Sequence, residues 1–283
     1  MSRPPMNGEK PETPPVALTI AGSDSSGGAG IQADLKTFTV LGCFGASALT
    51  AVTAQNTRGV TAAELLEPAF VASQIDAVAE DLPVAATKTG MLASPAIIEA
   101  VAERIARHQL EPLVVDPVMV AKSGDPLIDD DAVRVLAEKL MPLAMITTPN
   151  RHEAARLLDL DEPITTATAA GMAAQRICDR FGAATCIVTG IQRHRHGSEE
   201  ATDVFFDGHE VHELSHPWRD TRSTHGSGCT FSAALAAGLA LGKPLPGAVE
   251  LARQFIAAAV SNDLGLGHGQ GPVNHLAWLE LER

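Results

Sequence analysis

The feature that most constrains this sequence is a repeated alternation between short apolar runs and segments with the apolar spacing of a helix. It begins with an apolar run at 16–20, a Gly- and Ser-rich stretch, and a helical pattern over 31–41. The same alternation predicts strands at 46–53, 85–88, 113–115, 144–146 and 185–188, and helices at 69–79, 96–107, 132–140 and 168–180. Apolar strands that alternate with helices are typical of an α/β fold, in which helices cover both faces of a mostly parallel sheet.

The last third of the chain departs from this alternation. Predicted strands at 203–206 and 210–214 flank Asp207-Gly208, a dipeptide typical of a type I′ hairpin, so we expect a small antiparallel edge. Two helices rich in small residues are predicted at 229–241 and 247–261, and a Gly-rich stretch then leads to a short final helix.

Composition also indicates the domain organisation. Residues 1–15 contain five Pro and no apolar periodicity, which predicts a disordered tail. No linker or shift in composition divides the rest of the chain, so we expect a single domain over residues 16–283.

Charge and residue usage exclude several classes of protein. A formal net charge of −13, 4% aromatic residues and no Tyr disfavour a surface that binds nucleic acid. Four Cys without a C-x-x-C pair are typical of a reduced, cytoplasmic protein. Since no run approaches the ~18 apolar residues of a membrane span and the start lacks a signal-peptide pattern, we expect a cytoplasmic protein with no membrane partner.

A first glycine-rich loop, residues 22–30, lies between the first predicted strand and helix, where backbone N–H groups can approach a ligand closely. Residues 28–33 match G-x-G-x-x-A, the pattern of a dinucleotide site. However, the glycines begin past the predicted strand end, and the next strand leads to Gln55-Asn56 without an acidic partner for a ribose. We therefore favour a ligand-binding loop of another kind over a dinucleotide site or a plain turn.

A second glycine-rich loop, residues 224–230, runs directly into a helix of small residues. Successive N–H groups at a helix N-terminus form an anion site, and the Walker pattern of a P-loop is absent from the chain. The alternative is an ordinary Gly-rich helix entry that contains a buried Cys.

Acidic and amide side chains follow two further predicted strands. Asp116 comes directly after 113–115, and Asn150 and Glu153 follow 144–146. Carboxylates there could hold a hydrated Mg²⁺, which takes few protein ligands. The alternatives are a helix N-cap at Asn150 with Glu153 completing a capping box, and a turn role for Asp116. Six of the ten His lie between 194 and 225 without metalloenzyme spacing, so a polar excursion is the simpler interpretation there.

Taken together, these motifs resemble the hydroxymethylpyrimidine/phosphomethylpyrimidine kinases of thiamine biosynthesis, in the ribokinase-like superfamily. The resemblance runs from about residue 17 to the end of the chain, and its motifs are 17–38, 53–57, 88–92, 116–119, 148–150 with 153–154, 224–230 and 269–275. It implies a ribokinase-like three-layer sandwich, a homodimer, and transfer of a phosphoryl group from ATP to 4-amino-5-hydroxymethyl-2-methylpyrimidine and then to its monophosphate.

The resemblance also implies roles for particular residues. Around the pyrimidine it places Gly22, Asp34, Gln55, Met91 and Val118. Gln55 suits the aminopyrimidine edge because an amide both donates and accepts a hydrogen bond.

For the phosphate side of the site, the resemblance implies Mg²⁺ at Asp116 and Glu153, nucleotide binding at Asn150, Thr189 and Gly190, and a catalytic loop of Gly226, Ser227, Gly228 and Cys229. Cys229 occupies the position where most ribokinase-like enzymes have an Asp base. The helix N-terminus would lower its thiol pKa and a bound phosphate would raise it, so the sequence leaves the direction open.

The sequence departs from the family pattern in one place that bears on nucleotide binding. The usual Lys-Gly-Gly-His is replaced by the run 188–192, which contains no Lys, and Ser223 and Ser227 stand where Asn and Thr are usual. Two alternatives therefore stay open: a pyridoxal/pyridoxine kinase, and a non-catalytic pyrimidine-sensing protein.

Overall fold

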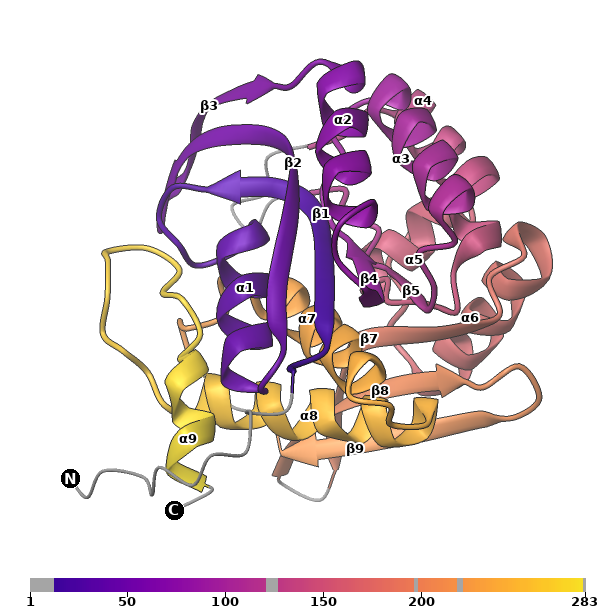
Figure 1. Cartoon of the computed structure of the whole chain (residues 1–283). Helices are drawn as coiled ribbons and strands as arrows, with labels where there is room; N and C mark the ends of the chain where they lie inside the picture. The colour runs from indigo at the N-terminus through magenta and orange to yellow at the C-terminus, as the bar shows by residue number, and fades with distance from the viewer. Residues whose placement is uncertain (1–12, 121–126, 196–197, 218–220, 282–283) are drawn as a thin grey trace.

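The computed structural model describes residues 13–120, 127–195, 198–217 and 221–281, so most of the predicted N-terminal tail lies outside the described residues. In this part of the chain, one sheet with the strand order β3-β2-β1-β4-β5-β6-β7-β8-β9 forms the centre (Figure 1). The strands are β1 (Val16–Asp24), β2 (Phe44–Asn56), β3 (Gly59–Leu65), β4 (Val84–Thr89), β5 (Leu113–Val115), β6 (Ile146–Thr147), β7 (Thr185–Arg195), β8 (Ser198–Phe206) and β9 (Val211–Pro217).

The pairing of the strands is mostly parallel, as the sequence predicts. The six strands from β2 through β1, β4, β5 and β6 to β7 pair in parallel. Both ends of the sheet are antiparallel, with β3 on β2 at one end and β8 and β9 beyond β7 at the other. The β8–β9 edge was predicted, whereas β3 was not.

Helices cover both faces of the sheet and produce three layers (Figure 1). One layer consists of α1 (Gly30–Val40), α7 (Ser227–Ala240) and α8 (Leu245–Ser261). The opposite layer consists of α2 (Pro68–Ala79), α3 (Pro95–His108), α4 (Asp130–Val135), α5 (Arg151–Leu157) and α6 (Ala167–Phe181). Short turns, η3 (His275–Ala277) and α9 (Trp278–Leu281), follow α8.

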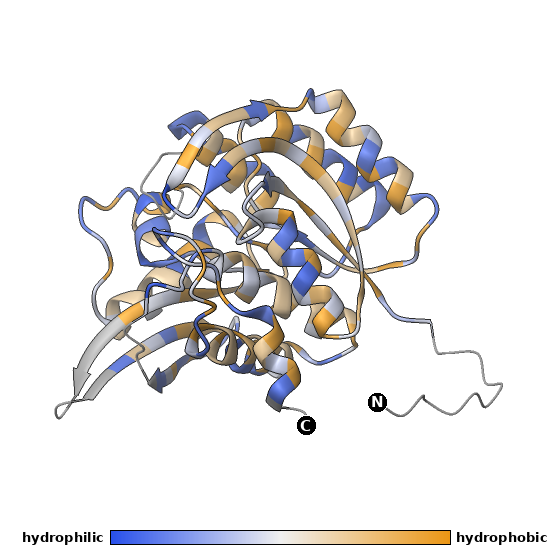
Figure 2. Ribbon diagram, turned by 90° about the vertical axis from the view of Figure 1, so that its left-hand side faces the viewer, coloured by the Kyte–Doolittle hydropathy of each residue, from blue (hydrophilic) through white to orange (hydrophobic). Residues whose placement is uncertain are grey.

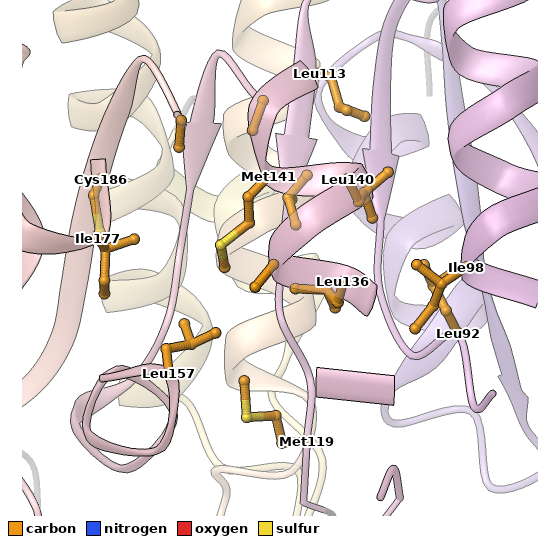
Figure 3. Close-up of a cluster of buried hydrophobic side chains, with 14 of the residues drawn as sticks. Leu92, Ile98, Leu113, Met119, Leu136, Leu140, Met141, Leu157, Ile177 and Cys186 are labelled. Atoms are coloured by element: carbon orange, nitrogen blue, oxygen red, sulfur yellow. The ribbon is translucent and has the colours of Figure 1, made fainter. Parts of the chain in front are cut away.

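Two apolar cores result, one on each face, because successive strand residues point to opposite sides. Leu113 and Val115 of β5 belong to the core under α2–α6, while Val114 between them belongs to the core under α1, α7 and α8. Figure 3 shows part of the first core, including Leu113, Met141 and Ile177. The outer helices alternate between hydrophobic and hydrophilic residues along their length, which leaves a polar face for solvent (Figure 2).

The structure corrects several predicted boundaries. Strand β1 extends to Asp24, so the first glycine-rich loop begins inside the strand, contrary to the prediction that the glycines lie well past its end. The helix predicted at 132–140 is α4 followed by a π-helical turn, η1 (Leu136–Leu140), and a 3-10 turn, η2 (Met141–Leu143). Among the described residues, no helix has the length and apolar character needed to cross a membrane.

The predicted type I′ turn is also wrong. The β8–β9 connection is a four-residue loop, closed by a hydrogen bond from the Asp207 N–H to the Glu210 carbonyl at 3.1 Å. A type I′ turn requires positive φ at both central residues, but only Gly208 has it here. The Asp207 side chain instead accepts hydrogen bonds from the N–H groups of His209 and Glu210, each at 2.8 Å.

Candidate active site

The predicted motifs meet at the carboxyl edge of the parallel strands, where ligands bind in open α/β sheets. The first glycine-rich loop begins at the end of β1, Gln55 lies near the end of β2, and Asp116 follows β5. Helix α7 begins at the same edge, because its first residues contact the first loop and its Ser232 hydroxyl donates to Asp116.

Asp24 organises the first glycine-rich loop. One carboxylate oxygen accepts hydrogen bonds from the N–H and the hydroxyl of Ser26, both at 2.8 Å. The other accepts from the N–H groups of Gly28 and Ala29, at 3.1 and 2.8 Å. Burial by itself would raise the pKa of Asp24, but these donors and His225 outweigh it and lower the pKa to about 2. The loop is therefore held by an ionised carboxylate.

His225 joins the second loop to the first. Its Nε2 atom lies 2.8 Å from a carboxylate oxygen of Asp24 and 3.5 Å from the side-chain nitrogen of Gln55. The next residue, Gly226, is the N-cap of α7 with φ 79°, and a methyl group there would overlap the carbonyl of Gly28. The two glycine-rich loops are thus packed backbone against backbone.

The predicted pyrimidine-binding residues lie around these loops. A methyl group on Gly22 would overlap the end of the Met91 side chain, so these two residues are in contact. Gln55 is half-buried, and its side-chain oxygen accepts a hydrogen bond from the Thr53 hydroxyl at 3.2 Å. Its backbone N–H and carbonyl both bond to the Ser25 hydroxyl at 2.8 Å. Val118 is half-buried in the segment after β5.

Asp34 lies deeper than the other predicted pyrimidine ligands. Its side chain is 0% exposed, and its carboxylate is occupied by the Thr19 hydroxyl at 2.7 Å and by the Lys88 ammonium, 2.9 Å from both oxygens. Burial raises the pKa of Asp34, while Lys88 and Thr19 oppose that rise. Burial would lower the pKa of Lys88, but the opposite charge of Asp34 raises it overall, so Lys88 is an ammonium ion.

Lys88 was not among the residues predicted for the site. One feature of the sequence could have indicated it. Lys88 is a charged residue within a strand, and Ala86, on the same face of that strand, packs in the core beneath α7. Such a lysine is rarely buried without a partner, so the strand itself required an acid somewhere in the fold.

Cys229 lies in the first turn of α7 and is half-buried as a residue. Burial of the thiol is the main cause that raises its pKa, to about 12. Lys88 and a hydrogen bond from the Gly30 N–H oppose this rise, whereas the acids Asp34 and Asp116 add to it. The sequence left the direction of the pKa shift of Cys229 open, and in the structure the pKa is raised, so the thiol is neutral at pH 7.

Asp116 and Glu153 form a buried acidic pair. Asp116 accepts a hydrogen bond from the Ser232 hydroxyl at 2.8 Å, and Glu153 accepts from the Asn150 N–H at 2.9 Å. Burial, and then the nearby charge of Asp116, raise the pKa of Glu153 to about 8. The Asn150 side chain accepts from the N–H groups of His152 and Glu153, so the capping-box alternative for Asn150 and Glu153 is confirmed.

The predicted nucleotide-binding residues are neighbours across β6 and β7. Thr189 forms an isolated parallel bridge with Asn150, and its N–H donates to the Pro149 carbonyl at 3.0 Å. Gly190 has φ 80° at an irregularity of β7, where its N–H donates to Asp203 at 3.0 Å. A methyl group on Gly190 would have no heavy atom within 4 Å, so this backbone faces open space.

A third segment, the Gly-rich stretch 265–271, closes the site from the C-terminal side. The Gln270 N–H donates to the Thr57 carbonyl at 2.8 Å, and the His225 N–H donates to the Gly271 carbonyl at 3.0 Å. The stretch therefore links the end of β2 to the second loop. In the part of the chain that the structure describes, no three His, Cys, Asp or Glu side chains are grouped so that they could hold a metal ion.

The chain is similar to known proteins over most of its length. The profile of the phosphomethylpyrimidine kinase family matches residues 24–274. A hydroxymethylpyrimidine/phosphomethylpyrimidine kinase of Rhizobium meliloti is 51% identical over 267 residues, which cover 92% of this chain and 96% of that protein. The bifunctional thiamine biosynthesis protein ThiED of Geobacter sulfurreducens is 49% identical over 259 residues, which cover 92% of this chain but only 52% of that protein.

Solved structures share the fold. The ADP complex of a pyridoxal kinase from Bacillus subtilis superposes with a TM-score of 0.85 and 38% identity, over 93% of this chain and 98% of that one. A phosphomethylpyrimidine kinase from Clostridium difficile 630 gives a TM-score of 0.74 and 40% identity, over 87% of this chain and 99% of that one.

Proposed function

Because this chain belongs to the phosphomethylpyrimidine kinase family, we propose that it transfers a phosphoryl group from ATP to 4-amino-5-hydroxymethyl-2-methylpyrimidine, and then a second one to the monophosphate. The single observation that carries this proposal is the packing of the α7 N-terminus against the loop beside Gln55. A helix N-terminus suits the transferring phosphoryl group, and a neighbouring amide suits the pyrimidine.

Gln55 provides recognition of the pyrimidine. Its amide can donate to a ring nitrogen and accept from the exocyclic amine, and Thr53 and His225 limit its rotation. Gly22 and Met91 border the same space, and Val118 lies across the sheet edge after β5. Asp34 supports this pocket from beneath, through Thr19 and Lys88.

The catalytic loop stabilises the group being transferred. The Ser227 N–H donates to the Thr224 carbonyl at 3.2 Å, and the Thr230 N–H donates to the Gly226 carbonyl at 2.8 Å. The N–H groups of Gly228 and Cys229 between them lie in the first turn of the helix and point toward its N-terminal end. These dipoles stabilise charge that develops on the phosphoryl oxygens. The thiolate form of Cys229 accepts the proton of the substrate hydroxyl. Since the thiol is neutral without substrate, the groups that favour the thiolate determine how much of this form is available.

The role of Cys229 has a direct kinetic test. If Cys229 is the base, Cys229→Ser lowers kcat by about 100-fold or more with pyrimidine binding retained, while Cys229→Asp keeps appreciable activity. A Cys229→Ser enzyme with near-normal kcat would show that Cys229 only packs, and that the proton leaves to water or to the phosphate.

ATP would bind beside Asn150, Thr189 and Gly190, with Mg²⁺ at Asp116 and Glu153. The acidic pair suits a divalent cation because burial and the charge of Asp116 both disfavour the ionised form of Glu153, and a bound cation would offset this. When bound, Mg²⁺ supplies positive charge to the phosphates. The exposed backbone at Gly190 provides the open surface on the nucleotide side, in place of the lysine that relatives of this family usually have.

A substrate panel tests the proposed function. ADP release is measured with the pyrimidine alcohol, its monophosphate, pyridoxal and pyridoxine at matched concentrations. The proposal predicts the highest kcat/KM for the two pyrimidines. A higher kcat/KM for pyridoxal would favour a pyridoxal kinase, an enzyme whose fold is also similar. Pyrimidine binding without ADP release would favour a non-catalytic sensor.

We also propose a homodimer formed through the β2–β3 edge. Strand β3 ends the sheet, and Val52 of β2 and Leu65 of β3 leave 45% and 47% of their surfaces exposed. An exposed edge strand with apolar side chains favours pairing with a second copy. Light scattering should give the mass of a dimer that Leu65→Lys converts to a monomer; a wild-type monomer at micromolar concentration would contradict this.

Residues 16–283 act, in our proposal, as one catalytic domain in the cytoplasm. All strands of the described residues join one sheet, and all four cysteines are free thiols, as in reduced compartments. Limited proteolysis should leave one resistant fragment that retains activity.

A further inference from the structure

The ion pair between Lys88 and Asp34 lies in the interior of the protein, directly beneath the site. Lys88 is opposite Thr19 in the register between β4 and β1, and Asp34 projects from α1 onto both residues. Both charged side chains are 0% exposed. A buried ion pair is often no more stabilising than apolar residues of the same size, so its presence here calls for a function beyond stability.

The elements packed around the start of α7 bring several charged groups near Cys229. They are Asp34 from α1, Lys88 from β4 and Asp116 after β5, and His275 from η3 lies against Thr230 of the same helix turn. Lys36 is exposed and donates to the Gly27 carbonyl at 2.7 Å. His275 bonds to the Thr230 hydroxyl at 3.0 Å and is neutral at pH 7, because burial lowers its pKa to about 4.

The electrostatic influences on Cys229 have opposite signs. Burial favours the neutral thiol, and Asp34 and Asp116 favour it further, whereas Lys88 favours the thiolate. Lys88 lies on the same face of β4 as Ala86, which packs beneath α7, so its ammonium lies on the side of the sheet that α7 covers. Its effect on Cys229 exceeds that of Asp34. Lys88 is held in this position by both carboxylate oxygens of Asp34, and the Thr19 hydroxyl in turn holds that carboxylate.

We propose that Lys88 is a positioning residue whose buried ammonium, oriented by Asp34, stabilises the negative charge that Cys229 carries during phosphoryl transfer. The inference rests on the proposed role of Cys229. A small fraction of the thiol has lost its proton to water at equilibrium, and this thiolate fraction is the reactive one. The thiolate then takes the proton of the substrate hydroxyl while that oxygen bonds to the γ-phosphorus, and the bond between this phosphorus and the bridging oxygen breaks to leave ADP. Lys88 keeps its own protons throughout.

Alkylation of Cys229 measures this effect without any turnover. Far below the thiol pKa, the rate of reaction with iodoacetamide is proportional to the thiolate fraction. The full-length enzyme without substrates is alkylated at pH 8, and the labelled Cys229 peptide is quantified by mass spectrometry. Cys229→Ser gives the background from the buried cysteines Cys43, Cys178 and Cys186.

The two partners of the ion pair should change this rate in opposite directions. Lys88→Met lowers it by about 10-fold or more, because the stabilising cation is lost, and Asp34→Asn raises it by about 10-fold. Lys243→Met is the matched control, since Lys243 is exposed beyond the other end of α7, and its rate stays at the wild-type value.

A purely structural ion pair gives a different result. Loss of either partner would then loosen the packing and raise both rates, and that outcome would overturn the proposal. If a single variant fails to fold, the double variant Lys88→Met/Asp34→Asn removes both charges, and its rate should still fall below wild type; a rate equal to or above wild type would overturn the proposal. A Cys229→Ser enzyme with normal kcat would refute the role of Cys229 as base, while the alkylation rates would still decide the role of Lys88.

Discussion

The packing of the two glycine-rich loops makes Gly226 the most sensitive backbone position of the site. Gly226→Ala places a methyl group against the Gly28 carbonyl, with φ fixed at 79°. The left-handed backbone costs an Ala about 1 kcal/mol. The overlap with rigid backbone adds about 1–3 kcal/mol, the usual cost of overpacking. The first turn of α7 must therefore move away from the loop that holds Gly28.

Gly242 provides a matched control at the other end of the same helix. Its φ is 75°, but a methyl group there meets no heavy atom within 4 Å. Gly242→Ala should therefore lose only about 1 kcal/mol in urea unfolding and keep wild-type kinetics. Gly226→Ala should lose about 2–4 kcal/mol and about 100-fold in kcat/KM, since a shift of ~1 Å at a catalytic group has that effect. Equal stability and equal kcat/KM in the two variants would refute the packing argument.

Three further predictions concern single side chains. Gln55→Ala should weaken pyrimidine binding by about 1–3 kcal/mol, seen as a raised KM, and unchanged KM and kcat would reject its role. Asp116→Asn or Glu153→Gln should raise the Mg²⁺ concentration for half-maximal activity, and full activity in excess chelator would exclude a metal there. His275 has its pKa lowered from 6.5 to about 4 by burial, so the folded state disfavours its charge. The stability that neutral His275 contributes is complete above pH 6.5 and is lost as the pH falls toward 4. The unfolding free energy should fall by about 3 kcal/mol over this range, and His275→Gln should abolish this pH-dependent fall. An unaltered pH profile of stability in that variant would contradict it.

The central strands could be predicted from the sequence because they are buried on both faces. Leu113–Val115 is an uninterrupted apolar run, and its predicted bounds are those of β5. Strand β3 could not be found in this way, since Gly59–Leu65 contains little apolar periodicity and most of it is exposed. Its pairing with β2 stabilises it, and no local pattern encodes that pairing.

The sequence could predict that the candidate site residues lie at the carboxyl edge of the sheet, but not how they contact one another. Polar residues at the ends of parallel strands lie along this edge, and Gln55 and Asp116 are two of them. The partners of the charged groups were not predictable. Lys88 and Asp34 are 54 positions apart, and His225 and Asp24 are 201 apart. Only the three-dimensional fold brings such pairs together. The raised pKa of Cys229 depends on the same packing, because burial is its main cause.

Analysis of the reaction products is the decisive test of the proposed two-step kinase activity. The enzyme is incubated with the pyrimidine alcohol, ATP and Mg²⁺, and the products are followed by mass spectrometry over time. The proposed activity predicts that the pyrimidine monophosphate appears first and that the diphosphate follows, with one ADP formed for each phosphoryl group transferred. ADP formation without any phosphorylated pyrimidine, or no reaction of the alcohol at all, would contradict it.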